Sequence, residues 1–171
     1  MNSDFLLIQK VKNGNEEAGE QLVNKYYASI YQYCFLHVRN RDHAEDLTQD
    51  TFVRFFEALG TYRNYGKTKS YLYCIAGNII KNYYKKKKDV LIDEFPEIPE
   101  SNMTDMETRL DIERAVDYLP EELKETAILF FFQELKQREI ADLLDIKLSL
   151  VKYRISRAKK ILSECLKVNN K

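Results

Sequence analysis

Glycine and proline are scarce in this sequence, with five and three residues among 171. Both residues are frequent in the turns that separate the short strands of all-β proteins, so their scarcity excludes an all-β fold and favours a mostly helical one. The apolar share of 44% and the charged share of 32% fit a globular protein. This length suits one ordinary domain or two small ones and is short for a large enzyme.

Long apolar runs are also missing. No run approaches the roughly 18 residues that a membrane-spanning helix needs, and the amino-terminal segment becomes polar by residue 9, unlike a secretory signal. The three cysteines, Cys34, Cys74 and Cys165, lie in apolar helical patterns, and the sequence has neither a CxxC nor an HExxH motif. We therefore expect buried, reduced thiols in a cytoplasmic protein.

The formal net charge is zero, which by itself argues against a nucleic-acid-binding protein, but the charges are segregated along the chain. Residues 1–88 carry fourteen Lys and Arg against nine Asp and Glu, and residues 89–108 carry seven acids without a Lys or Arg. Residues 147–171 carry eight bases against one acid. Two basic blocks thus flank an acidic segment.

Apolar residues recur at helical spacing on both sides of the acidic segment and predict an all-α fold of two small helical domains. The first domain, residues 1–88, is expected to be a four-helix bundle. Residues 89–108 have two prolines and no sustained period, which indicates a flexible acidic linker. The second domain is residues 109–171. The expected helices cover about 4–12, 16–39, 42–59, 70–88, 109–118, 121–133, 137–144 and 150 onward.

The last two of these helices, joined by a short turn, predict a helix-turn-helix. Ala141 suits the first helix because the second must cross it closely. The outward face of the second helix carries Lys152, Tyr153, Ser156, Arg157, Lys159 and Lys160. Arg, Lys and Ser reach base edges or phosphates in a major groove, so this face is typical of a DNA reader. The alternative is a basic terminal helix whose charges are solvated and favour the helix dipole.

The helix expected at 42–59 has two different faces when each residue advances about 100°. One face carries Ala44, Leu47, Thr51, Phe55 and Ala58. The other carries Asp42, Asp46, Gln49, Asp50, Val53 and Glu57. Such an acidic face repels nucleic acid and suits a basic protein partner, with Val53 and Phe56 offering apolar contact. Acids near a helix amino terminus also favour the macrodipole, but that alternative leaves Asp50 and Glu57 unexplained.

The stretch IAGNIIKNYYKKKK, residues 75–88, separates packing and polar side chains in the same way. Leu72, Ile75, Ala76, Ile79 and Tyr83 follow the spacing of a buried face. Asn78, Lys81, Asn82 and Lys85 share another face. The preceding loop adds Tyr62, Arg63, Tyr65, Lys67 and Lys69. Basic residues mixed with exposed aromatics suit unpaired bases, which stack on aromatic rings. The alternative places the tyrosines in the core, which we expect for Tyr71 and Tyr83 but not for Tyr65.

Four stretches carry a family resemblance: AEDLTQDTFVRFFEAL, SYLYCIAGNIIKNYY, LPEELKETAILFFFQELKQREIADLLDI and VKYRISRAKKIL. In this order and spacing they resemble a bacterial sigma factor of the sigma-70 family, of the small extracytoplasmic-function type with only the second and fourth conserved domains. The resemblance implies a factor that binds core RNA polymerase, recognises the minus-35 and minus-10 promoter elements and helps melt DNA. It also implies no catalytic activity, cofactor, metal or small-molecule substrate.

The resemblance further implies a role for each surface. The clamp helices of the largest polymerase subunit are expected to bind Asp46, Gln49, Asp50 and Val53. The minus-10 element is expected to contact Tyr62, Arg63, Tyr65, Lys67, Asn78, Lys81 and Asn82. The minus-35 element is expected to contact Lys152, Tyr153, Ser156, Arg157 and Lys160. The polymerase flap and an anti-sigma factor are further implied partners.

The sequence departs from the family at the helix-turn-helix. Many members have glycine where Asp145 stands, and because Asp tolerates the left-handed region, we expect the turn to survive. Lys147, Ser149 and Leu150 replace the usual residues at the start of the second helix. Ser149 is therefore the expected cap of that helix.

Two other classes of function stay open. A stand-alone helix-turn-helix regulator explains residues 109–171 but not the acidic face or the aromatic-basic loop, and it predicts tight duplex binding without polymerase. An enzyme is the third class. Cys34 and His37 stand three residues apart on one helix, but neither a third metal ligand nor a nucleophile-base set accompanies them, so we expect both in the core.

Overall fold

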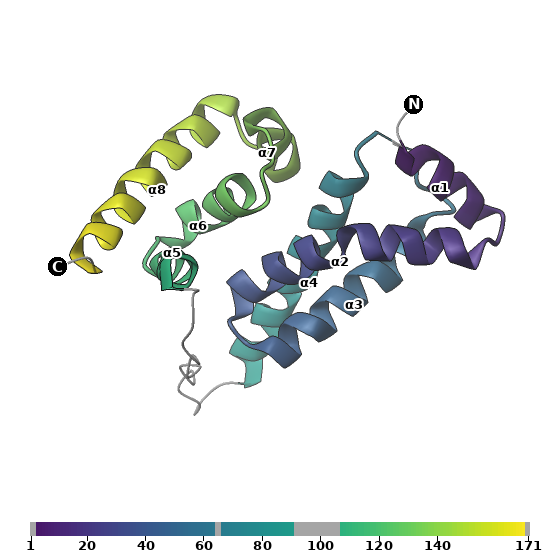
Figure 1. Ribbon diagram of the computed structural model, residues 1–171, viewed down its shortest axis with the longest axis horizontal. Coiled ribbons are helices and arrows are strands. Elements are labelled where there is room, and N and C mark those ends of the chain that lie inside the picture. Colours follow the sequence, from purple (N-terminus) through teal and green to yellow (C-terminus); the bar gives the residue numbers. More distant parts are fainter. Residues whose placement is uncertain (1–2, 64–65, 91–106, 170–171) are drawn as a thin grey trace. The chain divides into compact units, whose positions relative to one another are not determined.

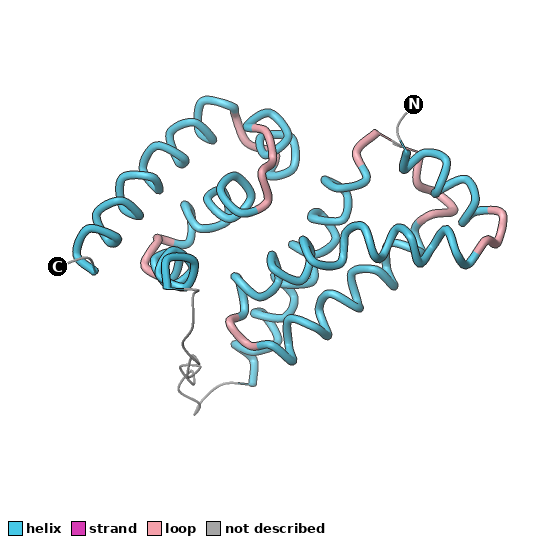
Figure 2. Tube along the Cα trace, in the orientation of Figure 1, coloured by secondary structure: helices cyan, strands magenta, loops and turns pink. Residues whose placement is uncertain are grey.

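The computed structural model of the protein describes residues 3–63, 66–90 and 107–169. Within these ranges the chain is helical apart from short loops (Figure 2), which confirms the expected all-α fold. The elements (Figure 1) are α1 Ser3–Lys12, α2 Glu16–Val38, α3 Arg41–Ala58, α4 Thr68–Val90, α5 Glu107–Asp117, α6 Glu121–Ala127, the π-helical turn η1 Ile128–Phe132, α7 Gln137–Leu144 and α8 Leu148–Asn169.

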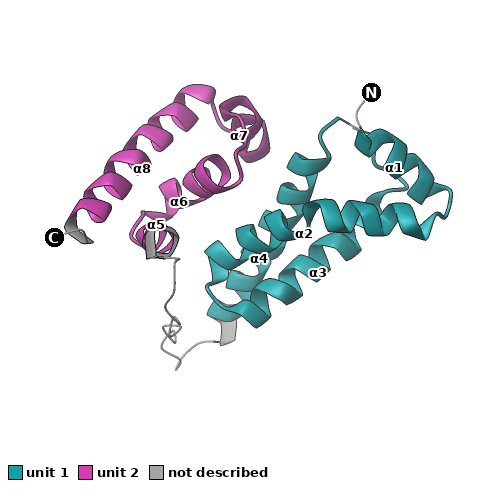
Figure 3. Cartoon of the chain, viewed as in Figure 1, with its two compact units in different colours: residues 1–97 teal, residues 98–171 magenta. Residues whose placement is uncertain are grey.

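The chain divides into two compact units, Met1–Glu97 and Ile98–Lys171 (Figure 3). The first contains α1 to α4 and the second contains α5 to α8. The segment expected to be a linker, 89–108, is helical at both ends, because α4 continues to Val90 and α5 begins at Glu107. The rest of that segment, residues 91–106, lies outside the described residues.

In the first unit, α2 packs against α1, α3 and α4. Its inward face includes Leu22, Ile30 and Leu36, each at most 1% exposed. The helix begins at the cap Asn15, whose side chain accepts a hydrogen bond from the Ala18 amide at 2.8 Å. Gly77 lets α4 approach closely, since a Cβ there would lie 3.2 Å from the Tyr33 hydroxyl. The core of this unit is therefore built around α2.

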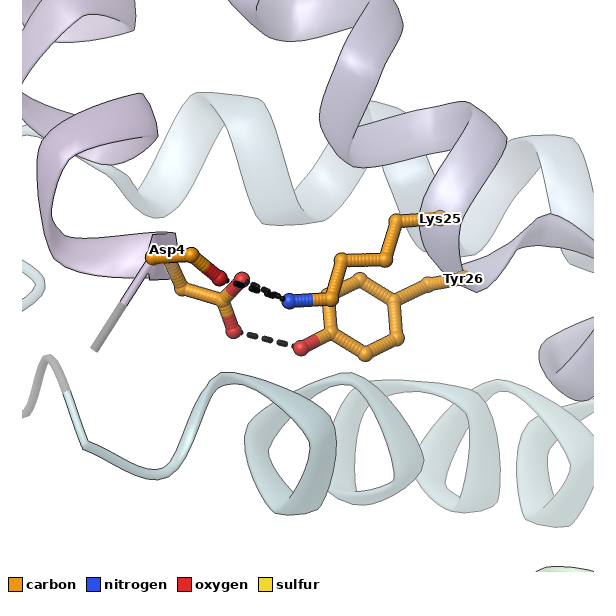
Figure 4. A network of polar contacts seen from close by, with 4 residues as sticks. Asp4, Lys25 and Tyr26 are labelled. Carbon is orange, nitrogen blue, oxygen red and sulfur yellow. Dashed lines mark hydrogen bonds and ion pairs between the residues drawn. The ribbon is translucent and has the colours of Figure 1, made fainter.

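A buried carboxylate attaches α1 to α2. Asp4 is 3% exposed, and two α2 side chains bind its oxygens (Figure 4). The Lys25 ammonium lies 2.5 Å from Oδ1, and the Tyr26 hydroxyl donates to Oδ2. Burial, with the hydrogen bond to Asp4, raises the pKa of Tyr26, so the hydroxyl keeps the proton that it donates. Removal of one member leaves a buried polar group without its partner.

In the second unit, α5, α6 and α7 all contact α8. The single helix expected at 121–133 is wrong in its second half, because the α-helical pattern ends at Ala127 and a π-helical turn follows. There the Gln133 amide donates to the Ile128 carbonyl, five residues back, at 3.1 Å. The wider turn still buries Ile128 and Leu129 completely. Apolar periodicity does not distinguish the two helix types over so short a segment.

The cysteines differ from one another in exposure. Cys34 is buried, as expected, but Cys74 is exposed and Cys165 is intermediate, so the prediction of three buried thiols is wrong. Cys74 lies on α4 between two buried residues, Tyr73 and Ile75, and its own side chain points outward. Desolvation raises the pKa of Cys34 to about 11. Cys34 therefore stays a thiol at neutral pH.

Asp4→Ala is expected to lower the free energy of unfolding by about 1–3 kcal/mol, because the buried Tyr26 hydroxyl loses its acceptor. Urea unfolding followed by circular dichroism measures this change. The control is Glu57→Ala, which removes an exposed acid from α3 and should change stability by no more than about 0.5 kcal/mol. Equal losses in the two variants would contradict the anchoring role of Asp4.

Iodoacetamide at pH 8 is expected to alkylate Cys74 well before Cys34 in the folded protein. Thiolate is the reactive form, and Cys34 combines complete burial with a raised pKa, whereas Cys74 is exposed. Peptide mass spectrometry over a time course measures the order. In urea the two rates should converge, and a persistent difference there would show that folding does not protect Cys34.

Candidate functional site

The outer side of α3 carries an acidic face, made of Asp42, Asp46, Gln49, Asp50, Val53 and Glu57. All six side chains are exposed, and Val53 is 55% exposed although it is apolar. On the opposite side Ala44, Leu47 and Phe55 are buried, so the predicted division of this helix into two faces is confirmed. The Asn40 side chain caps α3 by accepting from the His43 amide at 2.9 Å.

Beside this face α2 presents a row of aromatic rings that sequence reasoning missed. Tyr27, Tyr31 and Phe35 stack in turn, with centroids 6.4 and 6.3 Å apart, and Phe52 of α3 stacks on Tyr27 at 6.2 Å. The three α2 rings are half-buried. Desolvation, and then the nearby Glu45 carboxylate, raise the pKa of Tyr27. The i, i+4, i+8 spacing of the rings was the signal in the sequence.

The outer side of α4 exposes amides and ammonium groups. Asn78, Lys81 and Asn82 are all exposed, while Leu72, Ala76 and Ile79 on the inner side are buried. The predicted separation of packing and polar side chains is therefore confirmed. The four lysines in the last turns of the helix, Lys85–Lys88, are also exposed.

In the loop before α4, Tyr62 differs from its predicted position. Tyr62 is only 7% exposed, and its ring stacks on Tyr71 with centroids 4.6 Å apart. It also meets Phe55 at 6.2 Å. The prediction that Tyr62 contacts DNA is corrected, because its ring belongs to the core. Arg63 and Lys67 are exposed as expected, and Tyr65 lies outside the described residues.

The second unit contains the predicted helix-turn-helix, α7 followed by α8. Asp145 ends α7 in the left-handed conformation, with φ 51° and ψ 48°, and its amide donates to the Ala141 carbonyl. The expectation that Asp can replace glycine in this turn is confirmed. The Glu139 carboxylate accepts from the Lys136 amide at 2.7 Å and closes the start of α7. Ala141 is 9% exposed.

The expected cap of α8 is wrong. The helix begins at Leu148, before Ser149, and the Leu150 and Val151 amides donate to the Lys147 carbonyl at 2.9 and 3.2 Å. Ser149 therefore lies inside the first turn, and its exposed side chain joins the outer surface. The helix starts two residues earlier than the expected position.

The outer side of α8 carries a basic face, made of Lys152, Tyr153, Ser156, Arg157 and Lys160. All five side chains are exposed, with Tyr153 at 58%. The inner side buries Val151, Ile155, Ala158 and Leu162, which confirms the predicted apolar face. Such a face offers hydrogen-bond donors to phosphates and to base edges.

The side chains of Cys34 and His37 are both packed against the rest of the first unit. Cys34 is buried, and the His37 ring packs on Tyr33 with centroids 4.7 Å apart. Across residues 3–63, 66–90 and 107–169, no three side chains of His, Cys, Asp or Glu gather into a group that could hold a metal ion. Within the same ranges, none of the helices has the length and apolar character needed to cross a bilayer.

Two regions of the chain match known families. Residues 22–90 match Sigma-70 region 2, and residues 109–162 match Sigma-70, region 4. The chain is 29% identical to the ECF RNA polymerase sigma factor SigW of Bacillus subtilis, over 94% of this chain and 95% of SigW. It is 30% identical to the RNA polymerase sigma factor SigV of the same organism, over 82% and 86%.

Two solved structures show the same fold. CnrH in complex with the cytosolic domain of CnrY has a TM-score of 0.76 at 23% identity, covering 98% of this chain and 99% of the other. The sigma factor RpoE, in complex with the anti-sigma factor NepR from Bartonella quintana, has a TM-score of 0.71 at 22% identity, covering 87% and 96%. The two structures show the fold, and the matches in sequence establish that the chain belongs to the sigma-70 family, as an extracytoplasmic-function sigma factor that acts in promoter-specific transcription initiation.

Proposed function

We propose that this sigma factor divides its work among three surfaces, namely the acidic face of α3, the polar side of α4 and the basic face of α8. The observation that carries the proposal is their separation: each surface is exposed, and each lies opposite a buried apolar face of its own helix. Residues 1–88 form the core- and minus-10-binding domain and residues 109–171 the minus-35-binding domain. Residues 89–108 connect the two.

The acidic face docks on core RNA polymerase, at the clamp helices of the largest subunit. Asp46, Gln49 and Asp50 meet basic side chains there, and the exposed Val53 supplies apolar contact at the centre. Charge complementarity of this kind raises the association rate and selects the partner. The row formed by Tyr27, Tyr31 and Phe35 borders the same contact. The same charges repel DNA, which keeps this side of the unit away from the promoter backbone.

The minus-10 element lies along α4 and its preceding loop. Asn78 and Asn82 are amides that can pair with base edges, and Lys81 can neutralise a phosphate. Arg63 and Lys67 extend this surface. Tyr65 remains in the proposal as a base-stacking residue, whereas Tyr62 acts through the core by holding Tyr71.

The minus-35 element lies against α8 in the major groove of duplex DNA. Arg157 can form two hydrogen bonds with one guanine, and Lys152 and Lys160 are placed to contact phosphates. Tyr153 and Ser156 lie between them. Because α8 begins at Leu148, Ser149 also faces outward at the end that enters the groove first.

The factor works in the cytoplasm beside RNA polymerase, also contacts the polymerase flap, and has no catalytic activity of its own. An anti-sigma factor restrains it, which is supported by the two solved relatives: CnrH was captured with the cytosolic domain of CnrY, and RpoE with the anti-sigma factor NepR. A stand-alone regulator would instead bind its duplex tightly without polymerase.

Asp46→Arg combined with Asp50→Arg is expected to weaken binding to core polymerase by about 100-fold or more, because like charges then face each other across the contact. Titration of labelled protein with core enzyme measures the affinity. The control, Glu121→Arg with Glu122→Arg, makes the same charge change on exposed residues of α6. Wild-type affinity in the α3 variant would remove the acidic face from the proposal.

Arg157→Ala is expected to weaken binding of the polymerase complex to one upstream element by about 1–3 kcal/mol while binding to core stays unchanged. Arg157→Lys keeps the charge but loses the planar fork, so it should lose discrimination between bases nearly as fully. Footprinting on promoters with single base changes in that element measures both variants. A uniform loss on every sequence would assign Arg157 to a phosphate instead.

A further inference from the structure

A groove of about 680 Å³ opens beside the turn between α1 and α2. Val11, Val23 and Phe56 line it with apolar surface, and Glu16 and Glu20 contribute carboxylates. The three apolar side chains are half-buried and both acids are exposed. Its wall therefore combines a partly solvated apolar surface with negative charge, in a part of the first unit that the three proposed surfaces do not include.

Gly19 lines this groove at a position where a larger residue would also fit. It lies within α2, where glycine is a poorer helix former than alanine. A Cβ at this position would lie 3.7 Å from the Phe56 ring and 3.9 Å from Val11, which are ordinary contact distances. Alanine would thus fit and would favour the helix. Neither helix formation nor packing accounts for the glycine, which lines the groove together with Phe56.

The helix dipole of α2 does not account for all the negative charge of the groove. Glu16 lies in the first turn of α2, where an acid favours the dipole, but Glu20 lies beyond that turn. Lys12, next to Val11 in sequence, donates its ammonium to the Tyr62 carbonyl at 2.9 Å. The chemistry complementary to this groove is an apolar side chain with a Lys or Arg beside it.

The groove adjoins the acidic face through α3. Phe56 follows Val53 by three residues, so the two side chains are neighbours on one side of the helix. Glu57, the next residue, is a member of the acidic face and is exposed. A partner that lies along α3 from Asp46 to Glu57 would reach the groove at the carboxyl end of the helix.

We infer that the α1–α2 groove is a second docking point for core RNA polymerase, which extends the acidic face and accepts an apolar side chain from a basic polymerase helix. The inference rests on the proposed function, because it takes the same partner. The apolar contact in the groove supplies affinity at one end of the interface, whereas the charged contacts of α3 supply selectivity for the partner.

Two pairs of variants test the groove by competition with labelled wild-type protein for core RNA polymerase. Gly19→Leu fills the groove, and Gly19→Ala is its control. Glu20→Lys reverses one rim charge, and Glu17→Lys makes the same change at an exposed residue of α2 that does not line the groove. We expect Gly19→Leu and Glu20→Lys each to weaken binding about tenfold, and each control to stay within about twofold.

Each outcome decides the inference. Thermal unfolding identifies any variant that fails to fold, and if Gly19→Leu fails, the Glu20 and Glu17 pair decides alone. Wild-type affinity in the groove variants, or equal losses in Glu20→Lys and Glu17→Lys, would overturn the inference. A change in self-association without a change in core affinity would assign the groove to a second copy and overturn it as well. The proposed function fails separately, if wild-type protein does not bind core polymerase.

Discussion

Burial of the apolar side of α2 is the interaction on which the first unit depends. This helix contacts α1, α3 and α4, and Leu22, Ile30 and Tyr33 at its centre are at most 1% exposed. Burial of an aliphatic side chain such as Leu22 or Ile30 contributes roughly 1.5–3 kcal/mol. Because the neighbouring helices turn their apolar faces toward α2, their polar faces must turn outward. In the second unit α8 has the same position relative to α5, α6 and α7.

This constraint explains how a chain of zero net charge can present an acidic surface on one helix and a basic surface on another. Charges on the outer side of one helix act mainly on groups within about 8 Å in physiological salt. The acids of α3 and the bases of α8 therefore present two local potentials of opposite sign, and the sum over the chain is of little consequence. The placement of these charges on separate helices keeps the two potentials apart.

The two-faced helices were predictable because both faces follow from a period of 3.6 residues. Where the prediction was wrong, contacts between segments distant in sequence decided the outcome. Tyr62 is placed in the core by Phe55 and Tyr71, which no local pattern around residue 62 indicates. Cys74 is exposed although its neighbours Tyr73 and Ile75 are buried, since its position on α4 faces solvent. Helix ends were also uncertain by about two residues, as at Leu148, because several nearby residues can cap a helix.

By itself, the sequence determined the all-α class, the separation into two helical parts, the acidic, polar and basic faces, and the family resemblance. These depend on residue type and spacing within single helices. The tertiary structure alone decided which aromatic rings are core, how the buried Asp4 carboxylate is paired, where the π-helical turn follows α6, and that a groove lies between the α1–α2 turn and Phe56. The physical reason is that each of these features depends on side chains from separate elements, whose distances are set by packing and not by local periodicity.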